Sequence, residues 1–240
     1  MGFFLFVKQI VSSLWMLIIG GRGAFKSLKT KTAMVVPGAL PKHACDEMIF
    51  RMEKFLANID SRKVWQDDKG SDTRILGFED LIPDLLGLFR LDENIKAVES
   101  YTGRRARSWF LMANKLVPKD ENLGSGGGMH RDSPFSHQVK CIWYLNDVSS
   151  ENGPFQYIPE SNVGLIRARS RFPLGQTRFD ELTEKAVEVT GDAGTLLVCD
   201  TKCIHGGKPI LDGVRYAVTL YTLPKKEGKE TLFRKSGLMK

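Results

Sequence analysis

The stretches MHRDSPF (129–135) and CIHGGKPILDGVRYAVTLYT (203–222) decide how this chain is interpreted. In the first stretch, His130 and Asp132 are two residues apart, so on an extended strand they point the same way. In the second stretch, His205 must come from a different strand because it lies far along the chain, and Arg215 follows it. The sequence therefore predicts that two imidazoles and one carboxylate meet at a common metal ion.

This ligand set suits ferrous iron with open coordination positions. Two histidines and one carboxylate leave about three of six octahedral positions vacant, which a chelating 2-oxo acid and dioxygen can fill. The run VRYAVTLYT alternates, so Arg215, Ala217 and Thr219 share one face of a strand. A guanidinium binds a carboxylate through two parallel hydrogen bonds. We therefore expect Arg215, with Thr219, to hold the far carboxylate of 2-oxoglutarate.

At these motifs the chain resembles the phytanoyl-CoA dioxygenase-like branch of the iron- and 2-oxoglutarate-dependent oxygenases. The resemblance covers about 109–223, and its markers are HRD at 130–132, YLNDVSSENGPFQYIPESN at 144–162, Gly191-Asp192 and Arg215. Glu160 stands where the family usually has glycine, and Asn162 where it has histidine, which puts loop and substrate contacts in question rather than the metal site.

The resemblance implies a mainly β fold with flanking helices. The expected architecture is a double-stranded β-helix, a jelly-roll or cupin-like barrel with the metal at one mouth and an N-terminal helical layer. The implied catalytic residues and metal ligands are His130, Asp132 and His205, and the implied cofactors are Fe(II), 2-oxoglutarate and dioxygen.

A second alternating strand, expected at 138–146, adds candidate contacts to the cosubstrate or substrate. Lys140, Ile142 and Tyr144 share one of its faces, and the resemblance places that face in the barrel interior. We therefore expect Lys140 and Tyr144, with Asn114 from the preceding strand, to approach the cosubstrate. His137 has no partner at ligand spacing and is assigned to a place behind the ligands or on the surface.

Other interpretations of the same motifs are weaker. HRD also occurs in protein kinases, but no Asp-Phe-Gly or glycine-rich strand with a partnered lysine accompanies it. Cys199, Cys203 and His205 lack the second ligand pair of a structural zinc site. The glycines at 124–128 lack a phosphate-binding motif and predict either a flexible turn into the metal site or a mobile lid.

The pattern along the chain divides it into two parts. Residues 1–36 are expected to form an apolar helix and a basic linker, and residues 37–240 the oxygenase domain, with helices within 41–103. Residues 160–185 form a long connection in which Arg167, Arg169 and Arg171 alternate; they either contact an anionic substrate or form a solvated basic edge. Strands are expected at about 108–117, 128–135, 138–146, 154–158, 186–190, 194–200, 203–207 and 214–222.

The first twenty residues, MGFFLFVKQIVSSLWMLIIG, are strongly apolar with one polar stripe at helical spacing. Such a helix can lie in a membrane interface, and the basic segment after it would favour an anionic leaflet. Packing on the domain or on a second copy, and a cleaved signal, are the alternatives. Basic residues after the helix favour a cytoplasmic location, at the cytoplasmic face of a membrane if the helix anchors there.

Charge and cysteine usage limit the partners. The formal net charge is +7 and the pI about 9.2, which favours anionic partners, although solvated basic faces explain the same balance. No nucleic-acid-binding motif is present. Four cysteines without disulfide spacing indicate a reducing compartment. Oligomeric state is not predicted.

The sequence thus predicts an iron- and 2-oxoglutarate-dependent dioxygenase. We expect it to hydroxylate an unactivated C–H bond of a small or lipid-linked anionic substrate, with release of succinate and CO2. Desaturation and ring closure are left open, since they depend on substrate placement. The alternative is a non-catalytic, membrane-associated binding protein on the same barrel.

Overall fold

A computed structural model of the 240-residue chain describes residues 7, 10–11, 14–15, 18–57, 63–132, 136–163, 184–228 and 231. Arg167, Arg169 and Arg171, expected either to contact an anionic substrate or to form a solvated basic edge, lie outside the described residues.

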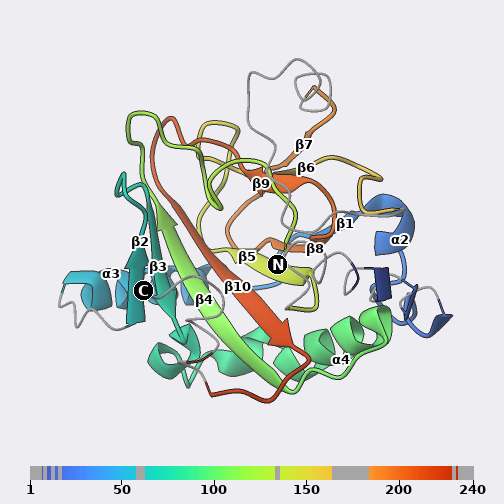
Figure 1. The fold of residues 1–240 in the computed structure, drawn as a ribbon. Helices are drawn as coiled ribbons and strands as arrows, with labels where there is room; N and C mark the ends of the chain where they lie inside the picture. The colour runs from blue at the N-terminus through green and yellow to red at the C-terminus, as the bar shows by residue number, and fades with distance from the viewer. Residues whose placement is uncertain are drawn as a thin grey trace.

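Two antiparallel sheets form the body of the protein (Figure 1). The seven-stranded sheet has the order β1-β8-β5-β10-β4-β3-β2, and the three-stranded sheet has the order β7-β6-β9. This arrangement is the predicted double-stranded β-helix. The strands are β1 (Ala33–Val36), β2 (Val64–Gln66), β3 (Asp72–Leu76), β4 (Ser108–Leu116), β5 (Val139–Tyr144), β6 (Phe155–Tyr157), β7 (Val187–Val189), β8 (Leu196–Asp200), β9 (His205–Gly207) and β10 (Arg215–Leu223).

The alternation of β10 determines which of its residues face the barrel interior. Tyr216, Val218 and Leu220 join the core between the large sheet and the helices. Ala217 belongs to the cluster between the two sheets, where it meets Tyr144. The opposite faces predicted from the sequence are therefore confirmed, and Arg215 and Thr219 lie on the same side as Ala217.

Helices cover the outer face of the large sheet, as the sequence predicts (Figure 1). The helix α3 (Lys42–Ala57) begins directly after Pro41, and α4 (Leu91–Thr102) ends at Gly103, whose φ of +67° is easily adopted by glycine. The remaining helical elements are short: α2 (Leu28–Lys31), η2 (Phe78–Leu81) and η3 (Leu86–Phe89). Met48, Met52 and Tyr101 are fully buried against the sheet.

Three parts of the predicted secondary structure need correction or addition. The strand expected at 128–135 is wrong for its described residues: only an isolated bridge joins His130 to His205. Positive φ at Gly126, Gly127 and Gly128 turns the chain there instead. The region 41–103 is not purely helical, because β2 and β3 extend the large sheet. Strand β1 pairs with β8 and lies within residues 1–36.

The N-terminal segment contacts the domain at the end of α4. Its described residues Val7, Ile10, Val11, Leu14, Trp15 and Ile18 are helical. Trp15 donates a hydrogen bond from Nε1 to the carbonyl of Gly103 at 2.7 Å, and Gly21 donates its N–H to the Tyr101 carbonyl at 2.5 Å. Within the described part of the chain, no helix has both the length and the apolar character needed to span a bilayer.

Candidate active site

The three predicted ligands lie together in the structure. Candidate ligand atoms of His130, Asp132 and His205 are all within 4.8 Å of one another. Asp132 Oδ1 is 3.5 Å from Nε2 of His130 and 3.8 Å from Nε2 of His205. Among the described residues, this is the one group of three or more potential ligands of this kind. Three nitrogen and oxygen donors around one point fit a divalent metal that keeps open positions.

Backbone contacts set the protonation of both imidazoles. Nδ1 of His130 lies 2.9 Å from the carbonyl of Gly128, and Nδ1 of His205 lies 3.1 Å from the carbonyl of Cys203. A carbonyl only accepts, so each Nδ1 carries the hydrogen and each Nε2 keeps a lone pair with which it could bind a metal. Burial, with the neighbouring His130, lowers the pKa of His205 to about 4, which keeps its ring neutral.

Backbone pairing, rather than strand alternation, brings the ligands together. His130 and His205 exchange two backbone hydrogen bonds, of 2.8 and 2.9 Å. The N–H of Asp132 bonds to the carbonyl of Thr201 at 3.0 Å, and Gln138 Nε2 donates to the carbonyl of Asp132 at 2.8 Å. The turn after β8 and the start of β9 thus fix the HRD segment on both sides.

The glycine-rich loop packs against this site. A Cβ at Gly124 would lie 2.1 Å from the carbonyl oxygen of Gly207, and one at Gly126 would lie 2.5 Å from Cε1 of His130. Gly207 in turn bonds through its N–H to the carbonyl of Ser125. The glycines therefore permit close backbone contact with β9 and with a metal ligand. The alternative of a mobile lid stays a prediction.

The carboxylate of Asp132 has a cation beside it. Burial disfavours its charged form, but Lys140 and the two imidazoles outweigh burial, so the pKa of Asp132 is lowered. Lys140 Nζ lies 3.7 Å from Oδ2 of Asp132 and 3.4 Å from the ring centroid of Tyr221. Burial lowers the pKa of Lys140 to about 8, although Asp132 opposes this change.

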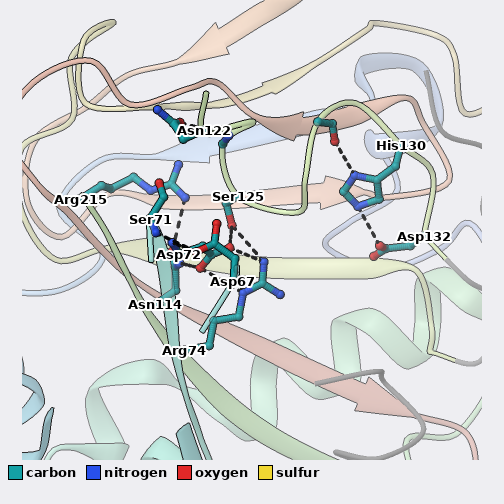
Figure 2. A network of polar contacts seen from close by, with 12 residues as sticks. Asp67, Ser71, Asp72, Arg74, Asn114, Asn122, Ser125, His130, Asp132 and Arg215 are labelled. Atoms are coloured by element: carbon teal, nitrogen blue, oxygen red, sulfur yellow. Dashed lines mark hydrogen bonds and ion pairs between the residues drawn. The ribbon is translucent and has the colours of Figure 1, made fainter. Parts of the chain in front are cut away.

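Arg215 lies at the other side of the barrel interior (Figure 2). It is buried and donates to the carbonyl of Gly153 and, over 3.4 Å, to Oδ1 of Asn114. Within the described part of the chain, its Nε is buried and has no hydrogen-bond partner. An orphaned guanidinium N–H is costly to bury, so it is a fitting donor for a bound carboxylate.

Two charged residues near this arginine were missed by the sequence analysis. Asp72 and Arg74 pair at 2.6 Å on β3, and Asn114 donates to Asp72 Oδ1 at 2.6 Å (Figure 2). Asp72 thus orients the amide whose oxygen accepts from Arg215. The alternation in DTRIL was an available signal, since it places Asp72 and Arg74 on one face of a strand.

The remaining predicted contacts have defined positions. Thr219 is buried on β10, in register with Ile142 and Met112. Tyr144 faces the interior, but its hydroxyl donates to the carbonyl of Val189 at 2.9 Å and accepts from the N–H of Phe155 at 3.0 Å. Tyr144 therefore connects the two sheets, and its contact with cosubstrate stays a prediction.

The spare histidine and the cysteines lie apart from the ligand set. His137 is buried, and its Nδ1 lies 2.9 Å from Oγ1 of Thr222, so the surface position considered for it is wrong. The thiols of Cys199 and Cys203 are buried 3.7 Å apart. No zinc-type cysteine and histidine cluster occurs among the residues that the structure describes.

A double-stranded β-helix with two histidines, one aspartate and a buried arginine defines the class of iron- and 2-oxoglutarate-dependent oxygenases. The model of the family "Phytanoyl-CoA dioxygenase (PhyH)" matches residues 33–213. The chain belongs to this family and is an iron- and 2-oxoglutarate-dependent dioxygenase with dioxygen as cosubstrate.

Solved structures agree on the fold. HygX from Streptomyces hygroscopicus, with nickel and 2-oxoglutarate bound, is 18% identical with a TM-score of 0.58, covering 85% of this chain and 87% of HygX. The carbocyclase SnoK from nogalamycin biosynthesis is 16% identical with a TM-score of 0.60, covering 82% of each chain. EvdO2 from Micromonospora carbonacea var. aurantiaca, complexed with 2-oxoglutarate, is 14% identical with a TM-score of 0.60, covering 87% and 93%. Among curated proteins, none matches the chain in sequence.

Proposed function

We propose that this dioxygenase hydroxylates an unactivated C–H bond of a small or lipid-linked anionic molecule, with release of succinate and CO2. The observation that carries the proposal is the pairing of two features inside one barrel. His130, Asp132 and His205 converge within 4.8 Å, and Arg215 offers a buried Nε without a partner in the described chain. The first feature fits a metal, and the second fits the far carboxylate of a cosubstrate.

Each residue has a role in this proposal. The Nε2 atoms of His130 and His205 and Oδ1 of Asp132 hold the iron, which when bound activates dioxygen at the expense of 2-oxoglutarate. Arg215 binds the distal carboxylate, and Asn114 fixes the guanidinium through a 3.4 Å contact. The buried Thr219 lies four residues further along β10, on the same face as Arg215. Because this interior excludes water, each charge-assisted hydrogen bond gains strength.

The wall near Lys140 supports an anionic substrate with an apolar part. Tyr221 stacks on Phe110 with ring centroids 4.9 Å apart, and Leu76 and Met112 belong to the same cluster. Lys140 lies over the Tyr221 ring. Burial opposes the charge of Arg74, but Asp72, with smaller contributions from Tyr221 and Asp132, outweighs burial and raises the pKa of Arg74. An apolar lining with two cations close to it favours a negatively charged group on an otherwise apolar molecule.

Turnover of 2-oxoglutarate tests the proposal. With Fe(II) and ascorbate, we expect the parent to form succinate, slowly without substrate and faster with one. His130→Ala and Asp132→Ala should abolish succinate formation, whereas His43→Ala, at an exposed histidine on α3, should retain it. Arg215→Met should raise the KM for 2-oxoglutarate more than it lowers kcat. Equal turnover by His130→Ala and the parent would refute the assignment.

The non-catalytic alternative predicts a different result. A binding protein on this barrel would form no succinate under any substrate, yet bind the same ligands. The complete ligand set and both Nδ1-to-carbonyl contacts favour the enzyme, because a barrel without turnover has no need of them. The substrate itself is best found by a metabolite screen for thermal stabilisation, with Mn(II) and an inert oxoglutarate analogue present.

We also propose that the N-terminal helix holds the enzyme at the cytoplasmic face of an anionic membrane. Val11, Leu14 and Ile18 are 59%, 53% and 73% exposed, and their spacing of three and four residues places them along one side of a helix. Arg22 and Arg105, near the helix, line an open hollow of about 410 Å³. Apolar side chains next to cations suit an interface of acyl chains and anionic headgroups.

Vesicle flotation tests this location. We expect the full chain to float with vesicles containing phosphatidylserine and less with purely zwitterionic ones. Leu14→Glu with Ile18→Glu should abolish flotation. Leu211→Glu, a matched change at a 60% exposed leucine distant in sequence, should not. If Leu14→Glu with Ile18→Glu leaves flotation intact but converts a dimer to a monomer, the helix face instead covers a second copy.

A further inference from the structure

Lys140 is a buried cation beside a metal ligand, and the proposed reaction assigns it no necessary step. It is 5% exposed on β5. Its ammonium lies 3.7 Å from Oδ2 of Asp132, the oxygen on the other side of the carboxylate from Oδ1. Oδ1 is the atom nearest to both imidazole nitrogens. The face of Tyr221 covers the ammonium at 3.4 Å. The Lys140 ammonium is therefore held beside Oδ2 of Asp132, whereas the two imidazoles lie nearest to Oδ1.

We propose that Lys140 is a positioning residue that holds Oδ2 of Asp132 away from the metal, so that the carboxylate binds through Oδ1 alone and the site accepts 2-oxoglutarate. The proposal rests on the proposed function, since it concerns the same metal and cosubstrate. It goes further by assigning a task to a residue beyond the ligand set and its backbone contacts.

Charge and geometry both support this role. A carboxylate can occupy one or two positions of a metal, and a cation on its second oxygen favours one. With Lys140 present, its charge of +1 cancels the −1 of Asp132, which lies 3.7 Å away. A bound divalent metal would then attract a dianionic cosubstrate with its full charge, because no net negative charge of this pair offsets it. Lys140 thus weakens metal binding somewhat and strengthens 2-oxoglutarate binding.

Stability alone does not explain the lysine. The free energy lost by desolvating a buried ion pair is about equal to the free energy gained from the attraction between its charges. An apolar side chain of similar volume would therefore stabilise the fold equally well. A methionine at this position would pack against Tyr221, whose cluster already contains Phe110 and Met112. The presence of the charged Lys140 side chain in these apolar surroundings is better explained by its effect on Asp132.

Two binding measurements of opposite sign test the proposal. Mn(II) binding is measured by calorimetry on the metal-free full chain, and 2-oxoglutarate binding on the Mn(II)-loaded chain, so neither requires turnover. We expect Lys140→Met to bind Mn(II) at least as tightly as the parent, by up to about tenfold, and to bind 2-oxoglutarate about tenfold or more weakly. Lys140→Arg keeps the charge and should retain most of the 2-oxoglutarate affinity.

Lys115→Met is the matched control. Lys115 also pairs with a carboxylate, Glu53 at 2.8 Å, and also lies over a tyrosine ring, that of Tyr216. It is on β4, and Tyr216 belongs to the core that faces the helices. Its loss should change neither affinity.

The outcomes separate this proposal from the proposed function. Weaker binding of both Mn(II) and 2-oxoglutarate by Lys140→Met, together with a lower Tm, would show that Lys140 is merely structural. Unchanged affinities would also overturn the proposal. If the parent itself bound no Mn(II), the proposed function would fail first. If Lys140→Met did not fold, Lys140→Gln would be used in the same two measurements with the same expectations.

Discussion

Gly126 determines where the imidazole of His130 can lie. A Cβ built on Gly126 would be 2.5 Å from Cε1 of His130, and the φ of Gly126 is +88°. Cβ contacts shorter than 3.4 Å are unusual, so in Gly126→Ala the ring or the loop must move by the difference, about 0.9 Å. Metal-ligand distances tolerate changes of about 0.2 Å. If the His130 ring moves by this amount, its imidazole is displaced by several times that tolerance.

Gly126→Ala is expected to lower both the stability of the fold and the affinity for metal, and the two effects can be measured separately. Forcing alanine into a left-handed conformation costs about 1–2 kcal/mol of stability, which lowers Tm by about 2–8 °C in a chain of this size. Displacing the imidazole lowers metal affinity by about 10–100-fold, as loss of a ligand's support does elsewhere. Calorimetric titration with Mn(II) measures the second part, and thermal unfolding of the metal-free chain measures the first.

Gly38, in the turn between β1 and α3, provides the control. Its φ is +66°, and a Cβ there would meet nothing within 4 Å. Gly38→Ala should thus lose similar stability but keep the parent's metal affinity. The reasoning is refuted if Gly126→Ala binds Mn(II) as tightly as the parent, or if Gly38→Ala loses as much affinity as Gly126→Ala.

Two further predictions concern buried polar groups. Tyr101→Phe should destabilise by about 2 kcal/mol, because the Tyr101 hydroxyl bonds to fully buried Asp200 at 2.7 Å, whereas Tyr216→Phe, at partly buried Glu53, should cost less in urea unfolding. Burial, helped by Arg104, lowers the pKa of His137 to about 4 from an ordinary 6.5. Between about pH 6.5 and pH 4, the unfolded chain binds a proton at His137 but the folded chain does not. Lowering the pH through this range therefore reduces the free energy of unfolding. At pH 5 the loss is about 2 kcal/mol. His137→Gln should remove that part of the decline between pH 7.5 and 5, and an unchanged decline would contradict the assignment.

The candidate metal-binding side chains and the alternating strands could be recognised from the sequence because their signals are local. Spacing within HRD, the alternation of VRYAVTLYT and the glycine after α4 each depend on residues adjacent in the chain. Side-chain periodicity follows directly from backbone geometry, so β10 and β5 present the predicted faces. The barrel fold itself was predicted from the family resemblance.

Other features required contacts between distant segments. Asp72 orients Asn114 across two strands, and Lys140 meets Asp132 only because β5 lies beside the HRD turn. His130 and Asp132 do not share a strand, and their convergence depends on pairing with His205 and Thr201.

The sequence by itself therefore determined which chemical groups are present and which side of a strand they occupy, since φ, ψ and side-chain alternation are properties of neighbouring residues. Only the tertiary structure decided which oxygen of Asp132 faces a cation, which nitrogen of Arg215 has no partner among the described residues and which glycine touches His130. Those outcomes depend on packing between segments tens of residues apart, and hydrogen bonds and charges act only over the few ångströms that folding sets.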